Sequence, residues 1–532
     1  MKSAHLLRLL PVLAVPALLV PHVTQLTTRA STDSMEVEGN AASSRSAIAI
    51  GGNLVAYESV ADNLVAGDTN QASDVFWHDR QTHLCLRVSV DSSGVEANDA
   101  SFEPSMSDDG RFVAFASAAN NLVAGDANGS RDVFVHDRQT GATTLASVPL
   151  AGGFGNSDSF SPTISADGRF VAFLSTASNL VPGDANGRID VFVRDRQTGA
   201  TARVSVSSAG AEGDADCVFA PAIRADGRFV AFTTAATNLV PGDTNGVTDV
   251  FVHDRASGQT RRVSVSSAGA QGNAASGRGP SLSDDGRVVA FTSSATNLVA
   301  GDGNGVEDAF VRDLQTGVTA RVSLASGGGE GNGPSGDPSI SADGRFVAFS
   351  SSASNLIPND TNGVPDIFSH DRLSGITLRA SVHSNNAEGN GASVLPSLSP
   401  DGRYVAFESL ASSLVNGDGN GCQDIFVRDT GAIGPFLTVT GACPGPVTLT
   451  ILGAGAHAQL AVLHGAAGSS ARQNPPCAGL TLGISQPLLG TIIWADSAGR
   501  ADLRFPAPPG ACGQTVQVVD LGTCVASNAV TL

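Results

Sequence analysis

Lysine is almost missing from this chain, and tryptophan and tyrosine are scarce. Lys2 is the single lysine among 31 Lys and Arg residues, and the chain holds two Trp and two Tyr. Without a second lysine, Schiff-base chemistry and a phosphate-binding P-loop are excluded from the rest of the chain. The scarcity of Trp and Tyr disfavours sugar recognition by stacking. The formal charge of -19 disfavours nucleic acid as a partner, because phosphates require clustered basic side chains.

Catalytic motifs are missing as well. No G-x-S-x-G motif occurs, and serines recur at the same places in successive copies of an internal repeat. No copy shows a unique carboxylate pair or a cluster of His or Cys residues, although a catalytic site normally breaks the symmetry of a repeat. The sequence therefore favours a protein without enzymatic activity.

The seven cysteines fall into two groups. Cys443, Cys477, Cys512 and Cys524 lie close together near the C-terminus, a density that predicts two disulfides in an exported protein, with all three pairings open. Cys85, Cys217 and Cys422 occupy unrelated positions and are expected to be isolated thiols. No cysteine spacing typical of a metal site occurs.

Residues 1–21 have the pattern of a secretory signal peptide. Lys2 and Arg8 precede an apolar run at 9–20 that is too short to span a bilayer. A short N-terminal membrane anchor is the alternative, because no clean cleavage site follows. We expect a secreted, periplasmic or cell-surface protein that has no membrane span after removal of the signal.

Most of the remaining chain consists of one repeat. A glycine of a D-G-R motif recurs at Gly110, Gly168, Gly227, Gly286, Gly344 and Gly402, with Gly52 as a degenerate first copy. Consecutive glycines are 58 or 59 residues apart. A constant period of this length, combined with short strand signals, predicts an array of β units.

Each repeat predicts a four-stranded antiparallel meander. The apolar runs 346–350 and 367–370 are typical of strands covered on both faces. Asp343-Gly344 predicts a tight two-residue hairpin with positive φ at both positions, and Ser374-Gly375 predicts a second hairpin into a strand at 378–382.

One family resemblance follows from the motif order. P-S-x-S-x-D-G-R-F-V-A-F, then D-V-F-V-x-D-R-x-T-G and R-V-S, as at 162–173 and 190–199, resembles the TolB-type, WD-repeat-like β-propeller repeat. The resemblance covers roughly residues 25–428 and implies a propeller. Propellers of this kind serve as scaffolds, receptors and accessory domains of enzymes, so the fold alone does not decide the function.

The two ends of the repeat region predict how the ring closes. Arg29-Ala30-Ser31 repeats the pattern of Arg379-Ala380-Ser381, and the last repeat lacks this segment. We therefore expect an all-β protein with a seven-bladed propeller at 25–435, closed by an N-terminal strand. An open β-solenoid is the alternative. Residues 436–532 lack the repeat and predict a small C-terminal β-sandwich-like domain.

The motif G-D-x-N-G-x-x-D between the second and third strands is the strongest candidate site. Its oxygen ligands at positions 1, 3 and 7 suit Ca²⁺. The seven sets are Asp68, Asn70 and Asp74; Asp126, Asn128 and Asp132; Asp184, Asn186 and Asp190; Asp243, Asn245 and Asp249; Asp302, Asn304 and Asp308; Asp360, Asn362 and Asp366; and Asp418, Asn420 and Asp424. The alternative is a metal-free loop in which the same side chains cap turns. Loops carrying Glu96, Glu212, Glu330 and Glu388 emerge on the same face, which we call the acidic face.

Histidines at one repeat position are a weaker metal candidate. His78, His136, His253 and His370 alternate there with Arg194, Arg312 and Arg428, and arginine cannot replace a neutral imidazole ligand. A solvated strand position is therefore predicted. Taken together, the sequence predicts an exported, non-enzymatic binding or surface scaffold for a protein or cell-surface ligand, monomeric, with Ca²⁺ on the acidic face. The alternative is a propeller-associated hydrolase or lyase with its site at the central channel.

Overall fold

The computed structural model describes residues 25–224 and 226–431, followed by strand segments at 436–441, 445–452, 459–471, 481–494, 501–507, 515–520, 525–526 and 530–531. The predicted signal peptide and the four C-terminal cysteines lie outside the described residues. Cys85, Cys217 and Cys422 are free, as predicted. Among the described residues, no helix is both long enough and apolar enough to span a membrane.

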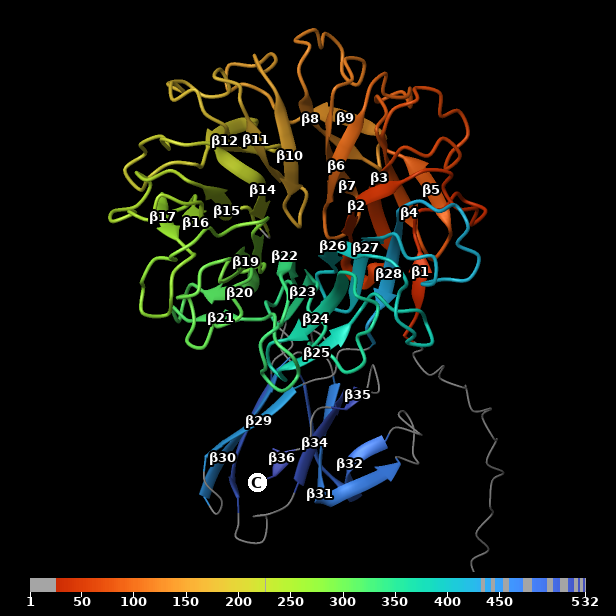
Figure 1. Cartoon of the computed structure of the whole chain (residues 1–532), viewed down its shortest axis with the longest axis vertical. Coiled ribbons are helices and arrows are strands. Elements are labelled where there is room, and N and C mark those ends of the chain that lie inside the picture. Colours follow the sequence, from red (N-terminus) through yellow and green to blue (C-terminus); the bar gives the residue numbers. More distant parts are fainter. Residues whose placement is uncertain are drawn as a thin grey trace, which may run out of the picture.

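Residues 27–429 form seven four-stranded antiparallel sheets arranged as the blades of a propeller (Figure 1). Blade 1 contains β2 (Ser43–Ile48), β3 (Leu54–Ser59), β4 (Asp74–Asp79) and β5 (Leu84–Arg87), with the short 3-10 helix η1 (Ile50–Gly52) between β2 and β3. Blade 2 contains β6 (Ser101–Met106), β7 (Phe112–Ser117), β8 (Asp132–Asp137) and β9 (Ala142–Leu145). Blade 3 contains β10 (Ser159–Ile164), β11 (Phe170–Ser175), β12 (Asp190–Asp195) and β13 (Ala200–Arg203).

The later blades repeat this order. Blade 4 contains β14 (Cys217–Ile223), β15 (Phe229–Thr234), β16 (Asp249–Asp254) and β17 (Gln259–Arg262), and blade 5 contains β18 (Ser281–Leu282), β19 (Val288–Ser293), β20 (Asp308–Asp313) and β21 (Thr319–Arg321). Blade 6 contains β22 (Ser335–Ile340), β23 (Phe346–Ser351), β24 (Asp366–Asp371) and β25 (Ile376–Arg379). Blade 7 contains β26 (Ser393–Leu398), β27 (Tyr404–Ser409), β28 (Asp424–Asp429) and, as its outermost strand, β1 (Thr27–Arg29).

The N-terminal strand closes the ring, as predicted. β1 pairs antiparallel with β28, with Thr28 opposite Val427. The first strands of neighbouring blades contact one another around the whole circle, so β2, β6, β10, β14, β18, β22 and β26 surround the central channel (Figure 1). The predicted seven-bladed propeller is therefore confirmed.

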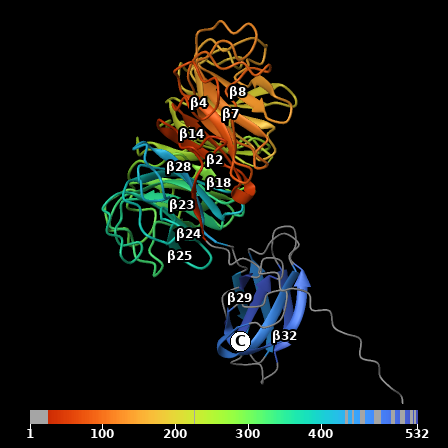
Figure 2. The ribbon, with the colours of Figure 1, turned by 90° about the vertical axis from the view of Figure 1, so that its right-hand side faces the viewer.

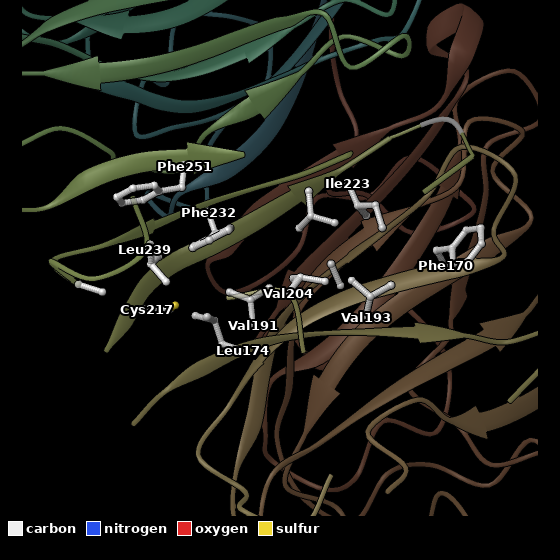
Figure 3. Packing of buried hydrophobic residues seen from close by; sticks show 13 residues of the cluster. Phe170, Leu174, Val191, Val193, Val204, Cys217, Ile223, Phe232, Leu239 and Phe251 are labelled. Carbon is white, nitrogen blue, oxygen red and sulfur yellow. The ribbon is translucent and has the colours of Figure 1, made fainter. Parts of the chain in front are cut away.

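The hydrophobic cores lie between neighbouring blades. One cluster joins Phe170 and Val193 of blade 3 to Phe232 and Phe251 of blade 4 (Figure 3). In every blade, an aromatic residue of the second strand stacks on a phenylalanine of the third, with centroids 5.9–6.0 Å apart. Each such buried side chain contributes roughly 1.5–3 kcal/mol. The apolar strands therefore bind each blade to the next.

The D-G-R turn brings neighbouring blades together. In blade 3, the Ser165 amide donates to Phe170 O, which leaves the four residues 166–169 in the loop. Only Gly168 of these has positive φ, at 71°. The predicted two-residue hairpin is therefore wrong. A Cβ on Gly168 would lie 2.1 Å from the ring of Phe112 in blade 2, so both the backbone conformation and the close approach require glycine.

Residues beyond 435 form a separate set of strands (Figure 2). One sheet contains β29 (Phe436–Gly441), β30 (Gly445–Leu452) and β33 (Ala501–Ala507). The other contains β32 (Thr481–Trp494), β31 (Gln459–Ala471), β34 (Thr515–Asp520) and β35 (Val525–Ala526), with β36 (Val530–Thr531) paired to β34. Two sheets of this kind agree with the predicted β-sandwich-like domain.

Candidate functional site

The seven Asp/Asn loops precede the third strand of each blade and hold themselves together by side-chain hydrogen bonds. In blade 3, Asn186 Oδ1 accepts a hydrogen bond from the amide of Arg188, and Asn186 Nδ2 donates to Asp190 Oδ2 at 2.9 Å. Ser205 Oγ donates to the other oxygen of Asp190 at 2.5 Å. The first two contacts are the turn-capping arrangement that asparagine forms without any metal.

An arginine guanidinium lies between the carboxylates in six of the seven loops. Arg203 Nη1 lies 3.0 Å from Asp184 Oδ1 and 3.3 Å from Asp190 Oδ2. Its Nη2 lies 2.5 Å from Glu212, which comes from the loop after the fourth strand. The equivalent arginines are Arg29, Arg87, Arg262, Arg321 and Arg379, all on outermost strands. We call each such group a guanidinium clamp.

The clamp occupies the place where a bound cation would meet the carboxylates. In blade 1, oxygens of Asp68, Asp74 and Glu96 lie within 4.8 Å of one another, a spacing that could hold a metal ion. Arg87 Nη1 lies 3.5, 3.3 and 2.8 Å from these three carboxylates. Burial, together with the neighbouring charge of Asp74, raises the pKa of Asp68 to about 6. Six loops thus contain a cation of their own.

Blade 2 lacks the clamp. Leu145, which pairs with Phe134, stands at the position that Arg203 occupies in blade 3. Phe154 stands at the position of Glu212. The loop residues Asp126, Asn128 and Asp132 are present, but no guanidinium lies between them.

The carboxylates of blade 2 show the effect of this replacement. Burial raises the pKa of Asp132 to about 6 and raises the pKa of Asp126 above its ordinary value. The buried Oδ1 of Asp126 has no hydrogen-bond partner among the described residues. The calcium prediction for the seven loops remains a prediction, and the blade 2 loop is the one in which the ligands are not already held by arginine.

The repeated histidines are buried, so their prediction as solvated positions is wrong. His136 is 7% exposed, and its Nδ1 lies 2.9 Å from Thr143 Oγ1. That hydroxyl donates to the carbonyl of Val90 in the preceding blade, so it accepts from Nδ1–H. Arg194 donates to Thr201 in the same way in blade 3. In six blades the histidine or arginine contacts a threonine hydroxyl in this way, whereas His78 of blade 1 faces Cys85 and its Nδ1 has no hydrogen-bond partner among the described residues.

A ring of strained residues lines one end of the central channel. Arg45, Glu103, Ser161, Phe219, Asp337 and Leu395 occupy one position of the innermost strands and have φ between 50° and 60°. Strand pairing is interrupted there, as in a β-bulge. Positive φ strains a non-glycine residue, and such strain concentrates at functional sites. Phe219 lies on β14 and is 49% exposed.

Three glutamates reach from one blade to the bulge of the next. Glu408 accepts a hydrogen bond from the amide of Arg45 at 3.0 Å, and Glu58 accepts one from the amide of Glu103 at 2.7 Å. Glu103 in turn accepts from the amide of Ser161 at 2.7 Å. The bulge amides therefore anchor carboxylates from three consecutive blades, 7, 1 and 2.

Two of these carboxylates, those of Glu58 and Glu103, lie next to the guanidinium of Arg45. Arg45 Nε lies 3.6 Å from Glu58 Oε1, and its Nη1 lies 3.5 Å from Glu103 Oε1. Burial raises the pKa of Glu58 and the pKa of Glu408. A cavity of about 380 Å³ is lined by Arg45, Glu58 and Glu103 and by Arg131 of blade 2. We call Arg45, Glu58, Glu103 and Glu408 the channel-mouth cluster.

Comparisons with known proteins give no family and no function. No protein-family model and no curated protein matches the chain. Among solved structures, the chain is similar to a putative TolB from Agrobacterium tumefaciens, with 14% identity over 66% of this chain and 96% of that one, at a TM-score of 0.35. It is also similar to a GH74 xyloglucanase from Xanthomonas campestris, with 11% identity over 93% of this chain and 78% of that one, at a TM-score of 0.39. The tricorn protease matches with 11% identity over 90% of this chain and 44% of its own length, at a TM-score of 0.24. Such weak likenesses carry no functional argument.

The opposite end of the channel also carries charged side chains. Asp108 Oδ1 of blade 2 lies 3.3 Å from Arg224 Nη1 of blade 4. Burial raises the pKa of Asp108 to about 6 and also raises the pKa of Asp284 in blade 5. Asp108 and Asp284 stand at a D-G-R turn position that is alanine or proline in four other blades and isoleucine in blade 1, and Arg224 stands where five other blades carry serine.

The prediction that no single blade has a unique carboxylate pair concerned one repeat at a time, whereas the channel-mouth cluster joins glutamates from three blades. Glu58 and Glu408 occupy a second-strand position that is Ala116 in blade 2 and Leu174 in blade 3. Comparing the repeats position by position would have found this difference. The meeting of the two glutamates with Glu103 required the fold, since the three residues are far apart in sequence.

Proposed function

We propose that this protein is an exported binding protein whose propeller holds a positively charged group of a protein or cell-surface ligand at the channel mouth. The observation that supports this most is the meeting of Glu58, Glu103 and Glu408 at the bulges of consecutive blades. Glu58 and Glu103 share the guanidinium of Arg45 there, and Glu408 accepts from the Arg45 amide, so the cluster has three carboxyl groups and one guanidinium.

Burial makes these carboxylates effective partners for a cation. The side chains of Glu58 and Glu103 are 14% and 20% exposed, whereas that of Arg45 is 54% exposed. Ion pairs gain strength where water is partly excluded. Arg45 can therefore move aside for an incoming ammonium or guanidinium group without losing much packing, while the carboxylates stay anchored by backbone amides.

A titration with a small cation tests the proposal. Nα-acetyl-lysine amide should bind to the full chain, and its Nζ-acetylated form should not. Glu58→Gln and Glu103→Gln should each weaken binding about tenfold or more, because hydrogen bonds to charged groups contribute roughly 1.5–3 kcal/mol. Glu36→Gln is the matched control, since Glu36 is 63% exposed and lies outside the mouth. Equal affinity of all variants would contradict a cation site at the mouth.

A hydrolase or lyase at the same mouth is the second candidate function. Its support is that burial raises the pKa of Glu58, which is the direction expected of a general acid. Glu103 shares Arg45 with it and would serve as the second carboxylate. Turnover of 4-nitrophenyl glycosides that disappears in Glu58→Gln would support catalysis, whereas loss of lysine-amide affinity without any turnover supports binding alone.

The calcium proposal is confined to the loop of blade 2. Its support is the missing guanidinium and the unpartnered oxygen of Asp126 among the described residues. In the other six blades, an ion would have to displace a buried arginine that already contacts the carboxylates.

A further inference from the structure

A pocket of about 380 Å³ lies between blades 4 and 5, on the face that carries the D-G-R turns. The contacts that join blade 2 to blade 3, and blade 3 to blade 4, explain why this space is open between blades 4 and 5. In blade 3, Arg196 stacks over Phe112 of blade 2, with 4.4 Å between the guanidinium carbon and the ring centroid. The same guanidinium donates to the carbonyl of Gly168. Arg255 joins blade 4 to Phe170 in the same way, at 4.7 Å. We call this contact the inter-blade staple.

Blade 5 lacks the staple. Leu314 follows Asp313 where Arg196 and Arg255 follow the equivalent aspartates. Phe229 of blade 4 therefore has Arg228 at 4.7 Å on one face, but no arginine from blade 5 stacks on it. Phe229, Leu314 and Gly286 all line the pocket, so the space corresponds to the missing guanidinium.

A second departure from the repeat falls in the same pocket. Arg261 stands opposite Val252, at a position that is Leu, Thr or Ala in every other blade: Leu86, Thr144, Ala202, Ala320, Leu378 and Thr28. Gln259 stands opposite Asp254, where four other blades carry an apolar residue. Both side chains line the pocket. The missing staple arginine and the polar replacements on β17 thus lie in the same pocket. This is expected of a binding site, whereas neutral substitutions would be scattered over the propeller.

One of the three guanidinium groups that line the pocket, that of Arg261, has no carboxylate partner among the described residues. Asp254 pairs with Arg228 at 2.8 Å, and Asp285 accepts from Ser283 Oγ and from the amide of Arg287. Arg287 is paired with Asp313 at 2.6 Å. Arg261 makes no side-chain hydrogen bond or ion pair with any residue that the structure describes, and it is exposed to solvent. A free guanidinium beside an aromatic ring favours an anion that carries a flat apolar body.

We propose that this pocket binds a small aromatic carboxylate. The ring of the ligand lies against Phe229 and Leu314, in the space that an arginine fills between other blades. Its carboxylate accepts hydrogen bonds from Arg261, and Gln259 supplies a further amide donor. The site is separate from the channel-mouth cluster, so it does not depend on the function proposed there.

Benzoate titrated into the full chain, followed by calorimetry and by saturation-transfer NMR, tests the proposal. Benzoate should bind, and benzamide, which lacks the charge, should bind at least about tenfold more weakly. Arg261→Leu should weaken benzoate binding about tenfold or more. The matched control is Arg188→Leu, which removes one positive charge from an exposed side chain outside the pocket and should leave the affinity unchanged.

Leu314→Arg provides an independent variant that restores the staple. The new guanidinium should cover Phe229, abolish benzoate binding and keep or raise the melting temperature of the protein. Equal benzoate affinity in Arg261→Leu and Arg188→Leu would overturn the proposal, as would equal affinity for benzoate and benzamide or no binding at millimolar benzoate. Arg261→Leu is a surface change, so the test stands even where Leu314→Arg fails to fold.

Discussion

Replacing Arg262 by leucine would give blade 4 the residue that blade 2 carries naturally as Leu145. Arg262 Nη1 lies 2.9 Å from Asp243 and 3.2 Å from Asp249. The three side chains are 10%, 4% and 0% exposed, so this is a buried clamp. Removing one partner of a buried pair costs about 3–5 kcal/mol, whereas a surface pair contributes only about 0–1 kcal/mol. We expect the larger cost for Arg262→Leu at neutral pH.

The cost should depend on pH in a defined direction. Burial already raises the pKa of Asp243, and Arg262 opposes that rise. Without the arginine, the pKa of Asp243 rises further, and protonation in acid relieves the unpaired charge. The destabilisation by Arg262→Leu should therefore shrink as the pH falls from 7 to 4. Adding Asp243→Asn to the variant should recover part of the lost stability at neutral pH.

Amide hydrogen exchange followed by mass spectrometry is the suitable assay, because a seven-bladed ring need not unfold in one step. Peptides covering β16 and β17 should lose protection by roughly a hundredfold or more in Arg262→Leu, since each 1.4 kcal/mol corresponds to about tenfold. Arg188→Leu is the control for the lost charge. Protection within threefold of the parent would refute the clamp as a stabilising element.

Three further predictions concern closure, metal and pH. Deleting residues 25–31 removes β1 and leaves blade 7 with three strands, so the melting temperature should fall by several degrees; an unchanged melting curve would contradict closure by this strand. Equilibrium dialysis should find one calcium per chain, lost in Asp126→Asn and kept in Asp184→Asn, and seven bound ions would show that arginine does not exclude the metal. Folding raises the pKa of Asp108 from 3.8 to about 6, so the folded state binds more protons in this range and its contribution to stability falls as the pH rises from 3.8 to 6. Asp108→Asn should flatten that part of the melting temperature profile between pH 3.5 and 7, and a profile identical to the parent would argue against it.

Much of the fold could be predicted from the sequence because the same pattern of turn glycines and apolar strands occurs in seven copies. The glycine spacing, the apolar strands and the R-A-S pattern at Arg29 predicted the blade number and the closing strand, and both are confirmed. The detail of the D-G-R turn did not follow. Asp343 instead accepts hydrogen bonds at Oδ1 from the hydroxyl of Ser341 and the amide of Arg345, and only Gly344 has positive φ.

The candidate sites were harder to predict, because their chemistry depends on residues from different blades. The Asp/Asn motif suggested an ion, but the arginine between the carboxylates comes from the fourth strand, about 13 residues beyond the last aspartate. His136 reads as polar and solvated, yet a threonine of its own blade and a carbonyl of the previous blade bury it. Positions where the repeats differ, such as Glu58, are a better guide to function than positions where they agree.

The closing strand also has a consequence for how the ring is made. Ser31 donates a hydrogen bond to Asp424, 393 residues further along the chain. β1 precedes the other strands of the ring in the chain, yet it cannot pair until β28, the last of them, has been synthesised. Before the two strands pair, β28 has an unpaired edge. Pairing costs the conformational entropy of closing the very long loop between β1 and β28. Pairing of β1 with β28 is thus a late and slow step of folding, and β1 stays unpaired until the strands of blade 7 have formed.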